Sequence, residues 1–155
     1  KGYGVRGGEW WYNVFTPRLL LERCVTRRNP SAAMLFFLFH GEVASIYVDE
    51  KLLDGSNRTR AAVFDPDFRL LPEQPGDSEP LHGFAIPADM KSRAIAAARS
   101  IGRTFEAVRV DIIPGDAGDL YLNEITLTNY GGMPLTSLRR DEELGEMWGR
   151  CSFLR

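Results

Sequence analysis

Short apolar runs, separated by polar segments or by segments rich in proline and glycine, dominate the pattern of this chain. Residues 34–39 are continuously apolar, which predicts a strand buried on both faces. Residues 43–48 are β-branched and aromatic enough to form its hairpin partner. Other short runs predict a strand interrupted by a charged pair at 19–25 and further strands at 61–65, 107–113 and 120–127.

Helical spacing and helix-start signals occur in two places. Pro87 is a helix-start signal, and the helix predicted at 88–103 carries an apolar stripe that indicates packing on a sheet. A second helix is predicted at 139–148, because acidic residues gather in its first turn, where the helix dipole favours them. Residues 66–86 hold four prolines and two glycines and are expected to form an irregular loop. Mostly antiparallel strands with two principal helices predict an α+β fold.

The composition is that of an ordinary globular domain. The chain has 155 residues, of which 44% are apolar and 26% charged, and its net charge is −2. These values exclude a disordered tail, a collagen-like repeat and a disulfide-rich mini-protein. The near balance of 19 basic and 21 acidic residues argues against a nucleic-acid partner. No apolar run reaches the ~18–20 residues of a membrane span, so we expect a single domain over residues 1–155 with no such span.

The cysteines and the first residue give two further expectations. Cys24 and Cys151 specify neither a disulfide framework nor a paired zinc-ligand spacing, so we expect a reduced, cytoplasmic protein. The chain begins at Lys1 with neither a signal peptide nor an initiator Met, so we expect a fragment of a longer protein. The sequence gives no indication of the oligomeric state.

Polar side chains interrupt the last two predicted strands. Strand side chains alternate between faces, so Arg109 and Asp111 share one face of the strand at 107–113. On the next strand the same alternation makes Leu120 and Leu122 begin a face that Glu124, Thr126 and Thr128 finish. If the two strands pair through the turn at 114–119, an arginine, two carboxylates and hydroxyl groups meet.

This group of side chains has two interpretations. A carboxylate buried without a partner costs several kcal/mol, so Arg109 is expected to form a salt bridge with Asp111 or Glu124. Alternatively, the two carboxylates supply oxygen ligands for Mg²⁺ and the arginine binds phosphate oxygens. The residue pattern alone leaves both open.

The same residues resemble the metal-binding end of the ATP-grasp superfamily. Arg109-Val110-Asp111 is similar to its R-V-D strand, and Asn123-Glu124-Ile125-Thr126 is similar to the E-[IV]-N motif that follows a hairpin. More closely, the chain resembles the TupA-like ATP-grasp family of bacterial cell-wall and exopolysaccharide gene clusters. The stretches that carry this resemblance are residues 9–12, 16–19 with Glu22, 64–65, 105–111, 122–128 and 144–148.

The resemblance implies roles for individual residues. Asp111 and Glu124 would bind Mg²⁺, with Glu124 as the bridging ligand, and Arg109 would contact the transferring phosphate. Thr126 stands where the superfamily usually has Asn, which puts a second Mg²⁺ in doubt. Glu22, Arg23, Cys24, Val25 and Asn29 would bind ATP, the backbone of Arg23 and Val25 bonding the adenine. In the loop at 128–137, Gly131, Gly132 and Ser137 would bind substrate.

The resemblance also implies an activity. It is that of an ATP- and Mg²⁺-dependent carboxylate–amine ligase, in which an acyl phosphate forms and an amine displaces the phosphate. The partners would be ATP and a small-molecule or polysaccharide-linked acid and amine, in cell-wall or exopolysaccharide modification. The chain would be the C-terminal lobe of such an enzyme, without the N-terminal lobe.

Two other hypotheses stay open. One is a catalytically degenerate ATP-grasp domain that binds a nucleotide or a partner, which Thr126 in the Asn position favours, as does the absence of upstream lysines from this chain. The other is a structural α+β domain in which Arg109, Asp111 and Glu124 form only an ion-pair network. Arg58 and Arg60 could reach phosphates, although basic residues in such a segment are more often solvated.

Overall fold

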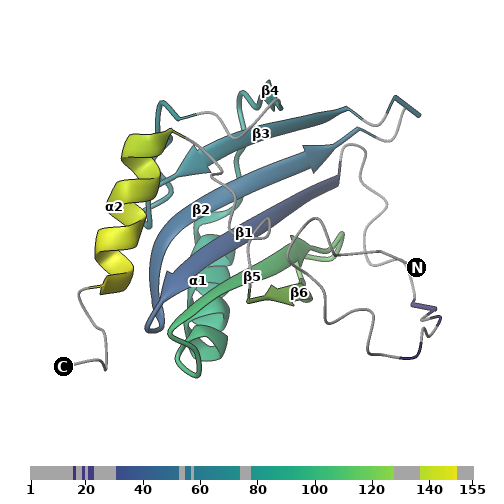
Figure 1. Ribbon diagram of the computed structural model, residues 1–155. Coiled ribbons are helices and arrows are strands. Elements are labelled where there is room, and N and C mark those ends of the chain that lie inside the picture. Colours follow the sequence, from purple (N-terminus) through teal and green to yellow (C-terminus); the bar gives the residue numbers. More distant parts are fainter. Residues whose placement is uncertain are drawn as a thin grey trace.

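Six strands form one sheet in the order β4-β3-β2-β1-β5-β6 (Figure 1). The computed structural model describes Thr16, Leu19, Leu21, Glu22 and residues 31–52, 55–56, 58–73, 78–127 and 137–149. Every strand pairing is antiparallel except that of β3 with β4. The predicted α+β class, with a mostly antiparallel sheet and two helices, is therefore confirmed. The elements are β1 (Ser31–Phe39), β2 (Glu42–Lys51), β3 (Thr59–Phe64), β4 (Glu79–Pro80), α1 (Ala88–Gly102), β5 (Ala107–Pro114), β6 (Leu120–Thr126) and α2 (Leu138–Gly149).

The central hairpin joins β1 to β2 through His40 and Gly41. Both residues have positive φ, 53° and 83°, as the type I′ turn of a tight hairpin requires. Gly41 also meets a close neighbour, because a Cβ there would lie 2.8 Å from Cγ of Arg103. The hairpin predicted from the two apolar runs is confirmed, and both strands continue beyond those runs into more polar residues.

One face of the sheet carries the main core and is covered by α1, which lies behind the central strands in Figure 1. Ala94 and Ala98 of α1 are fully buried there against β1, β2 and β5. The end of the helix approaches β1 closely, since a Cβ on Gly102 would lie 2.8 Å from Cδ2 of Leu38. The predicted packing of this helix on a sheet is therefore confirmed.

Helix α2 lies at the turn end of the β1–β2 hairpin. The Trp148 ring stacks on Phe39, with centroids 6.1 Å apart, and the Trp148 carbonyl lies 3.1 Å from Nε2 of His40. At the other end of the helix, Nη2 of Arg140 donates to the carbonyl of Ala44 at 3.2 Å. Ala44 is the extra residue of a β-bulge in β2, where the pairing with β1 shifts register.

Two predicted segments differ from the structure. Leu19, Leu21 and Glu22 lie outside any strand, and both leucines are 87% exposed. A strand needs a neighbour for its backbone hydrogen bonds, and no described pairing includes these residues; residues 23–25 lie outside the described part. The loop predicted at 66–86 contains the short strand β4, whose Pro80 is tolerated at a sheet edge. Within the described residues, no helix is long and apolar enough to cross a membrane.

Candidate functional site

The polar residues of β5 and β6 lie on the sheet face opposite to α1. Val108, Val110 and Ile112 of β5 belong to the core beneath α1, so the alternating Arg109 and Asp111 point to the other face. In the register of the two strands, Arg109 lies opposite Thr126 and Asp111 opposite Glu124. The predicted pairing of these strands, and the meeting of their polar side chains, are confirmed.

A β-bulge at Asn123 corrects the prediction about which residues share a face. The register passes from Ile112–Leu122 to Asp111–Glu124, which leaves Asn123 as an extra residue in β6. Directly paired residues share a face, so Leu122 lies on the α1 face with Ile112, and Glu124 lies with Asp111. Strict alternation had placed Leu122 and Glu124 together, and it fails because a bulge re-aims the side chains that follow it.

Arg109 is the centre of a hydrogen-bonded ion-pair network. Its Nε and Nη2 donate to the two carboxylate oxygens of Asp111 at 2.7 and 2.8 Å, a bidentate pair. Nη2 also donates to Oε2 of Glu124 at 3.2 Å. The side chains of Arg109 and Asp111 are 10% and 6% exposed, whereas that of Glu124 is 48% exposed. The network therefore runs from a buried pair to a carboxylate at the surface, and the expected salt bridge is present.

Burial dominates the electrostatics of Asp111. Loss of solvation raises its pKa, and the charges of Glu124 and Asp49 act in the same direction. The hydrogen bonds and charge of Arg109 oppose this rise without cancelling it. A further positive charge near a buried carboxylate of this kind would favour its charged form.

The hydroxyl of Thr126 orients the more exposed carboxylate. Its Oγ1 donates to Oε1 of Glu124 at 2.7 Å, while Oε2 of the same carboxylate accepts from Arg109. Glu124 is therefore held at both oxygens, which fixes its position on the surface of the sheet.

The donor set fits a hard divalent cation in chemical type. Two carboxylates and a hydroxyl supply the oxygen ligands that Mg²⁺ prefers. Among the described residues, however, no three or more His, Cys, Asp and Glu side chains are arranged to hold a metal ion. Because Arg109 binds both carboxylates, a cation at Asp111 and Glu124 must compete with the guanidinium.

The structure adds Asp49, which sequence reasoning missed. It lies near the end of β2, and its negative charge contributes to the raised pKa of Asp111. Its own pKa is raised by burial, while Arg109 and Lys51 act to lower it. The strand predicted at 43–48 stopped one residue short of Asp49, so its side chain was not assigned to a face of the sheet.

Of the other predicted site residues, those that the structure describes lie outside this network. Glu22 is exposed and outside any regular element. Ser137 caps α2, since its Oγ accepts from the backbone N–H of Arg140 at 3.2 Å. Arg58 lies 3.3 Å from Glu79, and Arg60 lies 3.8 Å from both Glu79 and Glu50. Arg23, Cys24, Val25, Asn29, Gly131 and Gly132 lie outside the described residues.

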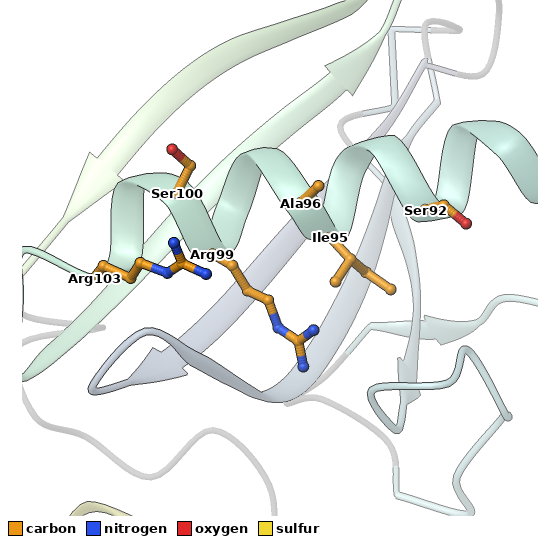
Figure 2. Close-up of a pocket in the computed structure, with 6 residues that line it drawn as sticks. All are labelled: Ser92, Ile95, Ala96, Arg99, Ser100 and Arg103. Carbon is orange, nitrogen blue, oxygen red and sulfur yellow. The ribbon is translucent and has the colours of Figure 1, made fainter.

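A separate hollow lies along the outer side of α1 (Figure 2). From this surface Arg99 pairs with Glu42 at 2.9 Å. Because α1 covers the sheet face opposite to Arg109 and Asp111, the hollow does not belong to their network. Its lining residues are Ser92, Ile95, Ala96, Arg99, Ser100 and Arg103.

Comparison with known proteins gives weak structural matches. No family model matches the chain, and no curated protein matches it. It is similar to a structure of ATP-grasp ligase PsnB complexed with minimal precursor, with a TM-score of 0.33, 12% identity, and coverage of 68% of this chain and 27% of that one. A structure of the same ligase with a phosphomimetic variant of minimal precursor, Mg and ADP gives a TM-score of 0.36, 10% identity, and coverage of 76% and 33%. The chain thus spans about a third or less of those chains, and at these values the likeness establishes no shared family.

Proposed function

We propose that the chain is part of an ATP-grasp ligase, an ATP- and Mg²⁺-dependent enzyme that joins a carboxylate to an amine. The observation that carries the proposal is the register of β5 and β6. It places Arg109 and Asp111 beside Glu124 and Thr126 on one face of the sheet, and these are the residues of the two motifs that resemble the ATP-grasp superfamily.

In this proposal each residue of the network has a role that its position supports. Mg²⁺ supplies charge neutralisation for nucleotide phosphates, and Asp111 and Glu124 would hold it. Thr126 keeps Glu124 in place through its hydroxyl. Arg109, whose guanidinium lies between both carboxylates, would bind a phosphate oxygen, because a planar guanidinium matches the geometry of phosphate.

Substrate class, partners and location belong to the same proposal. The TupA-like resemblance supports an acyl-phosphate route and a small-molecule or polysaccharide-linked acid and amine, used in bacterial cell-wall or exopolysaccharide modification in the cytoplasm. Residues 22–25 with Asn29 would hold the adenine side of ATP. Gly131, Gly132 and Ser137 would hold substrate at the start of α2, where a role for Ser137 must coexist with its helix cap.

The test is Mg²⁺-dependent nucleotide binding by the full-length gene product. The wild type and the variants are titrated with ATP by calorimetry, with and without Mg²⁺. Asp111→Ala and Glu124→Ala should each reduce the gain in ATP affinity that Mg²⁺ provides by at least about tenfold, since each removes an anionic ligand. Glu142→Ala, an exposed acid on α2, is the matched control and should bind as wild type. Unchanged ATP affinity and Mg²⁺ dependence in both site variants would refute the assignment.

A second candidate is a nucleotide- or partner-binding domain without turnover. The observation that favours it is that Thr126 uses its hydroxyl hydrogen on Glu124, where the superfamily usually has an Asn amide. Release of ADP by the full-length product, assayed with candidate acids and amines, separates the two. Mg²⁺-dependent ATP binding with no ADP release for any acid–amine pair favours the binding domain.

A further inference from the structure

The hollow on the outer side of α1 is lined by two arginines (Figure 2). Arg99 and Arg103 are four residues apart, so their side chains are neighbours on the helix surface. The hollow has a volume of about 440 Å³, within the range of pockets that hold small molecules. Ser100 adds a hydroxyl to its wall, and Ile95 and Ala96 add an apolar part. This lining fits a small, negatively charged ligand.

The guanidinium of Arg99 is only partly satisfied by its neighbours. Its Nη2 lies 2.9 Å from a carboxylate oxygen of Glu42, while its Nε is buried and finds no acceptor within the described part of the chain. The Nε and Nη2 edge of a guanidinium matches two oxygens of one anion, and Arg109 uses that edge on both oxygens of Asp111. Arg99 has one oxygen where this geometry takes two, and a buried donor without an acceptor costs free energy.

Arg103 brings a second positive charge to the hollow. A Cβ on Gly41 would lie 2.8 Å from Cγ of Arg103, so the stem of this side chain packs against the β1–β2 turn. Among the described residues, none forms an ion pair or hydrogen bond with its guanidinium. Like charges four residues apart on a helix repel. With Glu42 as the one acid paired to Arg99, the three groups carry one net positive charge.

We propose that this hollow binds the phosphate group of a small molecule or free phosphate. The phosphate oxygens take the Nε and Nη2 edge of Arg99 and the guanidinium of Arg103. Glu42, whose side chain is 73% exposed, gives up its place to the ligand and is solvated instead. Two guanidinium groups then face the ligand, which matches the charge of a phosphate dianion better than that of a carboxylate. The inference is independent of the proposed function, because α1 covers the sheet face opposite to Arg109.

The experiment is a titration of the full-length product with inorganic phosphate at constant ionic strength, followed by the phosphorus magnetic resonance line width. Arg99→Gln and Arg103→Gln should each weaken phosphate binding at least about tenfold, since each removes a charge-assisted hydrogen-bond donor. Arg93→Gln is the matched control, because Arg93 is a similarly exposed arginine of α1 outside the hollow. It should change binding less than about twofold.

A second variant pair tests the exchange of Glu42 for the ligand. Glu42→Gln should tighten phosphate binding roughly threefold, because it removes the competing carboxylate, whereas Glu50→Gln at the other end of β2 should not. Phenyl phosphate should bind more tightly than inorganic phosphate if the apolar wall holds the rest of a phosphate ester, and equal affinity identifies the free ion; either result supports a phosphate site. Wild-type binding by both arginine variants, or no phosphate binding by the wild type, would overturn the inference.

Discussion

Removing the guanidinium of Arg109 is the sharpest test of the ion-pair network. Arg109→Met keeps much of the volume and removes the bidentate partner of Asp111, whose side chain is 6% exposed. Breaking a buried pair by deleting one member costs about 3–5 kcal/mol, because the remaining charge is left uncompensated. The lost contact to Glu124 adds little, since that carboxylate is 48% exposed and water replaces the bond. The expected cost is a large share of a stability of roughly 5–15 kcal/mol.

The loss of folding stability caused by Arg109→Met should be smaller at low pH than at neutral pH. Burial already raises the pKa of Asp111 above 3.8, and Arg109 is what opposes the rise, so the variant should have a still higher pKa in the folded state. A folded state that binds a proton more tightly than the unfolded state loses stability as the pH rises through the folded pKa. The variant should therefore be destabilised less at pH 4.5 than at pH 7.5.

The assay is urea unfolding at both pH values, followed by circular dichroism. Arg109→Met with Asp111→Asn should recover much of the lost stability, because the second change removes the buried charge of Asp111 that lost its partner. Arg93→Met, which removes a half-exposed arginine from α1, should stay within ~0.5 kcal/mol of wild type. A loss below about 1 kcal/mol for Arg109→Met, equal at both pH values and unrelieved by the second change, would refute the reasoning.

Four further substitutions test other contacts by thermal or urea unfolding and metal titration. Gly102→Val should lower the free energy of unfolding by about 1–3 kcal/mol, since its Cβ would lie 2.8 Å from Cδ2 of Leu38. Gly145→Ala is the control, because nothing lies within 4 Å of a Cβ there, and it should stabilise α2 by up to about 1 kcal/mol. Equal effects of the two changes would contradict the close approach at Gly102. Ser137→Ala should lower the free energy of unfolding by ~1 kcal/mol, because the helix cap is lost. An unchanged unfolding midpoint would contradict this. Thr126→Val should weaken Mn²⁺ binding about tenfold by freeing Glu124, whereas unchanged affinity would show that the hydroxyl does not position the carboxylate.

The strands and the first helix were predictable because their signals are local. The continuous apolar run at 34–39 favours a buried strand, and Pro87 followed by an apolar stripe favours a helix that packs on a sheet. The run at 19–25 was assigned to a strand on the same local signal. There it failed at Leu19, Leu21 and Glu22, because a strand also needs a neighbouring strand, which local sequence does not specify.

The site was predictable in its residue types but not in its geometry. Alternation correctly placed Arg109 beside Asp111, whereas the bulge at Asn123 decided that Glu124 joins them and that Leu122 does not. The position of a bulge depends on how two strands pair across the sheet, and no residue type in β6 predicts a bulge from the sequence alone. Asp49 was missed for a related reason, since its relation to Asp111 runs through β1 and is visible only in the register.

The bidentate pair of Arg109 with Asp111 links the two interpretations that the sequence left open. The salt bridge occupies the same oxygens that a cation needs, and Glu124 shares its Oε2 with the same guanidinium. A cation that takes these ligands must therefore displace Arg109, and the displaced guanidinium needs a new anionic partner. In the proposed enzyme a nucleotide phosphate would be that partner. In that enzyme the ion pair would be the metal-free state of the proposed cation site, so stability without metal and affinity for metal are expected to change in opposite directions across variants of these residues.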